Sequence, residues 1–161
     1  MAKLNFKGID EYVAQLQKLQ DMSRECIGSA VYAGAGVVAD AVKQAIRDLP
    51  VDERTITADG YMMQGISRLQ KAGLIDGFGI APLRNENGYM HVKLGFAGYN
   101  AVKTKSYPHG QPNSVIARSV NSGTSFRQRI PFVDRAVSSI KNAAEQAMKN
   151  TLDKEIRRAL R

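Results

Sequence analysis

Residues 131–161 read PFVDRAVSSIKNAAEQAMKNTLDKEIRRALR, and they carry the most regular pattern in the chain. Their apolar residues recur at steps of three and four from Phe132 to Leu160. This spacing predicts one amphipathic helix, and Pro131 suits its first turn. About 29 residues would give a helix of about 43 Å, which is longer than a globule of this size needs. We therefore expect residues 153–161 to project, to pack on a partner subunit or to fray.

Two further helical patterns precede this one, over residues 6–20 and 23–48. Asp10 is suited to cap the first, and Pro50 marks the end of the second, because the residue before a proline disfavours helix. The second contains GAGVVA (34–39), which matches a dinucleotide-binding pattern. That pattern needs a strand before its first glycine, whereas the apolar spacing here is helical on both sides. We interpret these small residues as a close helix contact. The first helix carries its apolar pattern at Tyr12, Val13, Leu16 and Leu19.

The middle of the chain alternates short apolar stretches with turn-rich ones. Residues 61–74 predict a short helix with Gly73 at its end, and 114–120 fit either a helical turn or a strand. Residues 77–83 and 89–96 predict two strands joined through Asn85-Glu86-Asn87-Gly88, which has the chemistry of a hairpin turn. The remaining segments predict a loop at 51–60, a long, mobile, basic loop at 97–113, a turn at 121–124 and an extended arm at 125–130.

These elements predict one α+β domain over residues 1–161, a length typical of a single domain. It has a helical N-terminal part (6–50), a small, mostly antiparallel sheet with long loops (77–130) and a long C-terminal helix (131–161). Hydrophobic residues make up 43% of the chain, enough for a buried core. A lone cysteine, Cys26, excludes an intrachain disulfide and indicates a reducing compartment. The start lacks the apolar region of a signal peptide and the longest uncharged stretch has 14 residues, so we expect a soluble protein without a membrane span.

The net charge of +8 is unevenly distributed. Residues 1–80 hold nine basic and ten acidic side chains, whereas 81–161 hold fourteen and five. Such a split indicates a surface that faces an anion. Between residues 93 and 135 Asp134 is the one acid, and the basic residues are Lys93, Lys103, Lys105, Arg118, Arg127, Arg129 and Arg135.

The sequence supports two interpretations of this basic set equally. One is an ordinary solvated surface, and the other is contact with phosphates of any nucleic-acid sequence, which would weaken steeply with salt. Aromatic residues are sparse among these positions and no recognition-helix or zinc-finger pattern is present, so base-specific binding is not expected. Lys103, Lys105, Arg118, Arg127 and Arg129 are the residues we expect to contact DNA or a neighbouring subunit.

No catalytic, cofactor or metal motif is expected. His91 and His109 are far apart in sequence and lack neighbours with zinc-ligand spacing. Cys26 has no nearby histidine or lysine in sequence to activate it as a nucleophile. No set of residues combines an acid, a base and a nucleophile, so an enzyme is the class we favour least.

Several short motifs, in order along the chain, resemble the head–tail joining and tail-component family of long-tailed bacteriophages. The run ARSVNSGT (117–124), followed by PFVDRA (131–136) and a long helix, resembles that family's Glu-x-Gly-Thr turn and Pro-Phe helix start. The opening FKGIDEY (6–12), the helix end at Leu49-Pro50 and the strand VKLGF (92–96) fit as well. Asn121 and Ser122 replace the family's acid, Arg135 replaces its second proline, and residues 51–74 form a longer segment than is usual.

This resemblance implies a structural virion protein rather than an enzyme. Members of the family form rings, commonly sixfold, that connect the head to the tail or complete or terminate the tail. By the resemblance, Asn121, Gly123, Thr124, Pro131 and Phe132 are structural, with Gly123 allowing the turn and Phe132 anchoring the helix to the sheet. The implied partners are further copies of the chain, adjacent neck or tail-tube proteins and packaged DNA, with no membrane. The implied location is the virion, and the host cytoplasm during assembly. A small basic protein that binds DNA without sequence preference remains the alternative.

Overall fold

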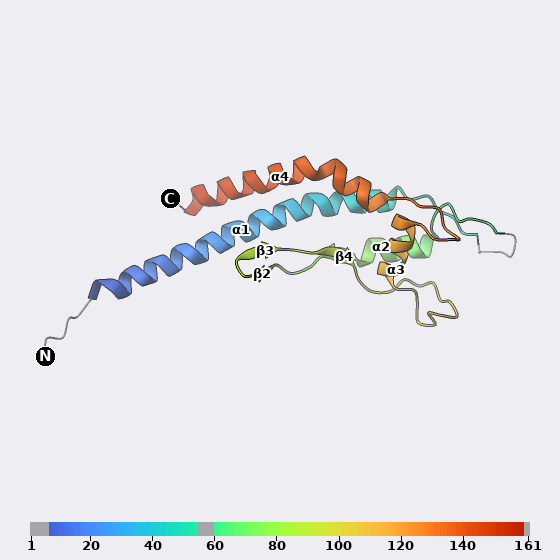
Figure 1. The fold of residues 1–161 in the computed structure, drawn as a ribbon, viewed down its shortest axis with the longest axis horizontal. Helices are drawn as coiled ribbons and strands as arrows, with labels where there is room; N and C mark the ends of the chain where they lie inside the picture. Colours follow the sequence, from blue (N-terminus) through green and yellow to red (C-terminus); the bar gives the residue numbers. More distant parts are fainter. Residues whose placement is uncertain (1–6, 55–59, 160–161) are drawn as a thin grey trace.

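The molecule is an elongated, two-helix stem with a small head at one end (Figure 1). The structure is a computed structural model, and it describes residues 7–54 and 60–159. The stem consists of α1 (Lys7–Arg47) and α4 (Phe132–Ala159), which lie side by side and antiparallel. The head consists of α2 (Arg68–Gly77), α3 (Asn113–Ser122) and the loops that join them to the stem. The predicted α+β class, with its long C-terminal helix, is confirmed.

A narrow β-ribbon runs along α1 (Figure 1). Its two antiparallel pairs are β1 (Phe78–Ile80) with β4 (Leu94–Phe96) and β2 (Arg84–Glu86) with β3 (Tyr89–His91). The predicted hairpin turn is confirmed, because Asn87 and Gly88 both have positive φ angles, 54° and 87°, as a type I′ turn requires. The ribbon is tied to the stem where the Leu83 amide donates to the Tyr32 hydroxyl over 2.8 Å.

The predicted break between two N-terminal helices is wrong, since α1 is continuous from Lys7 to Arg47. Residues 20–23 contain neither glycine nor proline, and a cap-forming residue such as Ser23 does not end a helix without a breaker. Asp10 therefore lies inside α1 rather than at its start. The predicted end before Pro50 is confirmed.

The predicted helix at 61–74 begins later than expected. Residues 61–66 are not helical, and two of them form isolated bridges, Ile66 with Val51 and Met63 with Arg127. The helix starts only after Ser67, whose hydroxyl accepts from the Gln70 amide while the Gln70 side chain accepts from the Ser67 amide. This capping box sets the start of α2. Residues 55–59 of the predicted 51–60 loop lie outside the described residues.

The largest buried cluster lies where the stem meets the head. Phe78 of β1 packs against Phe96 of β4 with the rings tilted by 47° and their centroids 4.9 Å apart, and Phe96 meets Phe132 of α4 edge-on at 6.2 Å. Phe132 is buried, so its predicted role in anchoring the last helix to the sheet is confirmed. The buried aliphatic residues around these rings are Val42, Ile46, Leu49, Ile66, Leu74, Ile116 and Val120.

The C-terminal end of α4 stays helical to Ala159 and lies beside α1, so the expectations that it projects or frays are wrong over the described part, while packing on a partner subunit stays a prediction. Glu155, Arg158 and Ala159 line a shallow hollow together with Met22 and Cys26 of α1. The predicted close helix contact at the small residues is confirmed, because a Cβ on Gly34 would lie 2.5 Å from Met148 Cγ. The part of the molecule that projects is instead the first part of α1 (Figure 1).

Candidate functional site

The five residues singled out by the family resemblance come together at the junction of α3 and α4. Gly123 ends α3 with a φ of 76°, a conformation that favours glycine. Asn121 reaches across the junction, and its Oδ1 accepts from the Val133 amide in the first turn of α4 over 3.1 Å. Its Nδ2 donates to Asp134 over 3.1 Å. Asn121 therefore caps α4 from outside the helix, while Thr124, Pro131 and Phe132 complete the same junction.

Arg127 lies inside the head, so the expectation that it contacts DNA or a neighbouring subunit is wrong. Its side chain is 4% exposed, and its Nη1 donates to the Gly65 carbonyl over 3.0 Å. The predicted extended arm turns back at this point, because Thr124 and Arg127 exchange backbone hydrogen bonds of 3.0 and 3.3 Å. Burial lowers the pKa of the guanidinium, and the charge of Asp52 opposes that shift. Arg127 thus holds residues 63–65 against the arm.

Asp52 forms a second polar cluster in the head. Its carboxylate is 6% exposed and accepts from the Tyr61 hydroxyl at 2.8 Å and from the Gln64 amide at 3.0 Å. Arg54 Nε donates to it over 3.0 Å, and the guanidinium also lies 3.8 Å from the centre of the Tyr61 ring. The Gln64 hydrogen bond, together with Arg54, lowers the pKa of Asp52. Because its acceptors are satisfied within the chain, this cluster is structural.

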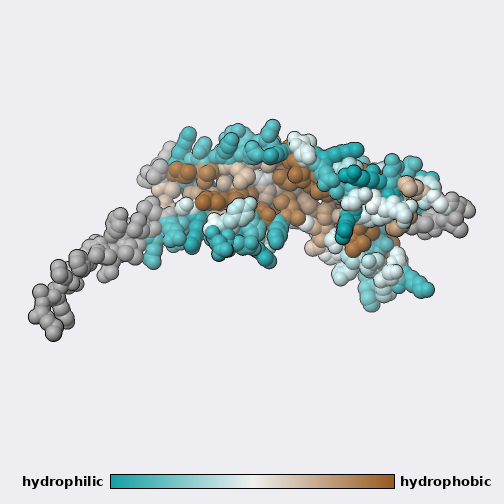
Figure 2. Space-filling view, viewed as in Figure 1, coloured by the Kyte–Doolittle hydropathy of each residue, from teal (hydrophilic) through white to brown (hydrophobic). Residues whose placement is uncertain are grey.

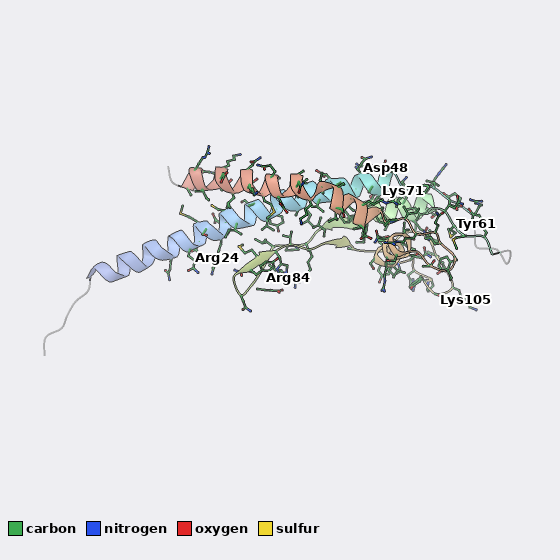
Figure 3. All side chains as sticks on the ribbon, turned by 45° about the horizontal axis from the view of Figure 1, so that its top comes forward. Arg24, Asp48, Tyr61, Lys71, Arg84 and Lys105 are labelled. Atoms are coloured by element: carbon green, nitrogen blue, oxygen red, sulfur yellow. The ribbon has the colours of Figure 1, made fainter. Side chains whose placement is uncertain are left out.

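The other expected contact residues are exposed. Lys103 and Lys105 lie on the long loop at either side of Thr104, which pairs with Tyr107 through two backbone hydrogen bonds. Arg118 is exposed on α3, and among the described residues no carboxylate lies within ion-pair distance of these three cations. Figure 3 shows Lys105 on the head, far from Arg24, which lies part-way along the stem.

Arg129 is exposed but already engaged at the junction. Its Nη2 lies 3.8 Å from Asp134, and its Nε donates to the Asn121 carbonyl over 3.4 Å. The structure thus joins Arg129 to the cap of α4 and leaves Lys103, Lys105 and Arg118 as the accessible cations of the expected set.

Residues at the base of the 97–113 loop form a clasp that sequence reasoning missed. The side-chain Nδ2 of Asn113 donates to the Ala97 carbonyl over 2.8 Å, and the backbone amide of Asn100 donates to the Gln111 carbonyl over 2.9 Å. Gly73, predicted as a helix end, lies inside α2 instead, where a Cβ would be 2.5 Å from the Asn100 Cβ. The asparagines hold the loop against α2. The sequence of residues 114–120 fits either a helical turn or a strand, and the structure forms a helix there, α3.

The described residues contain no group of three or more His, Cys, Asp or Glu side chains that could hold a metal ion. The stretch Gln20–Arg47 is long and apolar enough to cross a membrane by length and composition, with a mean hydropathy of 1.2. A core helix passes the same test, and this stretch contributes Val42 and Ile46 to the buried cluster.

Comparison of the chain with known protein families, with curated proteins and with solved structures found no match.

Proposed function

We propose that the protein is a structural, non-enzymatic component of the neck of a long-tailed bacteriophage. Copies of it would form a ring that joins the head to the tail, or that completes or terminates the tail. The observation that carries this proposal is the exposed surface of the chain, which is 11516 Å². A compact monomer of 17.6 kDa would expose about 7,900 Å².

The difference, about 3,600 Å², is several times the roughly 800 Å² that one partner loses in a standard interface. Such a surface suits a subunit that neighbours cover on two sides within a ring and on one face against an adjacent ring. The family resemblance supports the same role, and the motif residues Asn121 and Gly123 lie at the α3–α4 junction.

The proposed partners are further copies of the chain, with the sixfold symmetry common in the family, and an adjacent neck or tail-tube protein. The proposed location is the virion, after assembly in the host cytoplasm. Lys103, Lys105 and Arg118 are exposed on the head and would meet packaged DNA or an acidic neighbouring ring.

Native mass spectrometry and negative-stain microscopy of the purified full chain test the proposal. We expect closed rings, or assembly when the protein is mixed with purified phage heads or tails. A protein that stays monomeric and never joins heads or tails would overturn it.

The exposed cations favour one alternative, a small protein that binds DNA through phosphates. A titration against salt separates it from the neck protein, because neutralised phosphates release counterions. The alternative predicts a steep fall of log K with log salt, and a slope near zero removes it. Lys103→Gln and Lys105→Gln should each reduce the slope by about one, since each removes one phosphate contact. The matched control is Lys141→Gln, an exposed change on α4 that should leave the slope unaltered.

A further inference from the structure

The stem carries an apolar groove that the described part of the chain leaves open. It has a volume of about 330 Å³ and is lined by Ile27 and Val31 of α1 and by Met148 and Leu152 of α4, with Glu145 and Lys149 beside them. Ile27 is 40% exposed and Met148 36% exposed. Figure 2 shows apolar side chains gathered along the stem between its polar margins.

The groove borders the contact between α1 and α4 and lies apart from the part of α1 that the ribbon covers. The ribbon lies over Gly28, where a Cβ would contact Leu83 and Met90, and α4 lies over Gly34. Ile156 of α4, 43% exposed, continues the line of Met148 and Leu152 at steps of four. The eight helical steps from residue 148 to residue 156 extend the apolar strip over about 12 Å.

A second feature of the stem is the part of α1 that extends past the end of α4. Because the last described turn of α4 lies beside residues 22–26, residues 7–21 project beyond it, and we call them the α1 arm (Figure 1). Fifteen helical residues span about 22 Å, and an isolated helix of that length is marginal in water. In the sequence, apolar residues at 13, 16 and 19 recur at helical spacing.

We propose that the groove on each copy binds the α1 arm of a second copy. The arm cannot reach the groove of its own chain, because α1 is one continuous helix that leads away from it. Charge favours the pairing, since the arm holds two basic and three acidic residues and residues 141–159 hold five and three. Each copy gives one arm and receives another, a head-to-tail contact that can close into a ring. In that respect the inference rests on the proposed function.

Disulfide trapping between two full-length chains tests this contact directly. Both chains carry Cys26→Ala, one adds Leu16→Cys in the arm and the other adds Leu152→Cys in the groove. A disulfide needs the two Cα atoms within about 7 Å, so we expect a covalent heterodimer on oxidation of the co-expressed chains. The matched control replaces Leu152→Cys with Gln146→Cys, an exposed position on α4 that does not line the groove. Trapping in both combinations, or in neither, would overturn the inference.

A second measurement examines the assembled state. Leu152→Glu places a charge in the groove, and we expect the concentration for half-association in native mass spectrometry to rise about tenfold or more. Gln146→Glu adds the same charge outside the groove and should assemble like the wild type. Unfolding curves that coincide for the two variants would show that both are folded.

The outcomes separate this inference from the proposed function. Wild-type-like assembly of Leu152→Glu would remove the arm contact while the neck role stands. Specific trapping in a protein that never joins heads or tails would remove the neck role and leave the arm contact. A wild-type chain that is monomeric and gives no trapped product would remove both.

Discussion

The side chain of Asn121 bonds both to the first turn of α4 and to Asp134, and substitution can separate the two contacts. Asn121→Ala leaves the Val133 amide without its acceptor, and we expect it to lower the free energy of unfolding by about 1 kcal/mol. Asn121→Asp keeps an acceptor for the Val133 amide, but it replaces the Nδ2 donor with a carboxylate oxygen 3.1 Å from Asp134, where like charges repel. It should therefore cost at least as much as alanine at neutral pH. Urea unfolding measures both.

The control for Asn121 is Asn142→Ala, an exposed change inside α4 that should stay within about 0.5 kcal/mol of the wild type. Equal effects of the two alanine variants would mean that the bond from Val133 contributes nothing to the stability of the junction.

Asp52 gives the head a stability that depends on pH. Its pKa is lowered in the folded state, mainly by the Gln64 amide, so the ionised carboxylate stabilises the fold above the unfolded pKa of about 3.9. That contribution is lost as the pH falls below this value toward the folded pKa. We expect urea titrations below about pH 4 to show a shallower loss of stability in Asp52→Asn than in the wild type. At neutral pH the variant should be the less stable protein.

An aspartate on the outside of the stem provides the comparison for Asp52. Asp40 is exposed, and its side chain makes no hydrogen bond or ion pair with any described residue. Asp40→Asn should follow the wild-type pH dependence. If Asp52→Asn follows it too, the bonds from Tyr61 and Gln64 do not stabilise the charged carboxylate.

Gly34 and Gly36 of α1 differ in that α4 lies only against Gly34. Comparing the alanine variants of the two glycines therefore tests how closely the stem helices approach. Gly36 faces open space, so Gly36→Ala should raise the free energy of unfolding by roughly 0.8 kcal/mol through helix propensity. Gly34→Ala gains the same propensity but places its Cβ 2.5 Å from Met148 Cγ and 2.8 Å from Met148 Sδ. We expect it to be less stable than Gly36→Ala by about 1 kcal/mol or more. Equal stabilisation in thermal and urea unfolding would contradict the close contact.

The elements that could be predicted from sequence are those set by local chemistry. The periodicity after Pro131 identifies α4, and Asn87-Gly88 identifies the hairpin turn, because both signals lie within a few residues. The start of α2 was missed although Ser67 and Gln70 form a capping box, a local signal that was available. The non-helical path of residues 61–66 has no such local signal, since it depends on bridges to Val51 and Arg127.

At the scale of the whole molecule, the sequence could not reveal which charges face solvent. Arg127 and Arg129 alternate in a basic arm, yet Arg127 bonds to Gly65, 62 residues away, and only Arg129 is exposed. The clasp of Asn100 and Asn113 on α2 depends on long-range packing in the same way. The junction residues were found through family resemblance, and their contacts came from the structure.

The continuity of α1 through residues 20–23 determines the overall shape of the molecule and supplies the arm. A distance measurement within the chain can test it. Spin labels at Gln17→Cys and Asp40→Cys, both exposed, lie either side of residues 20–23, in a Cys26→Ala background. A straight helix separates them by 23 residues, or about 35 Å. We expect a narrow distance distribution there by pulsed electron resonance, with labelled chains diluted into unlabelled ones so that each distance is intramolecular.

The control pair, Arg24→Cys with Gln44→Cys, lies wholly beyond residues 20–23 and should give about 30 Å whether or not α1 bends. A short or broad distribution for the first pair alone would mean that α1 bends at residues 20–23. The arm could then fold onto its own stem, and no second copy would be needed to fill the groove at Ile27 and Leu152.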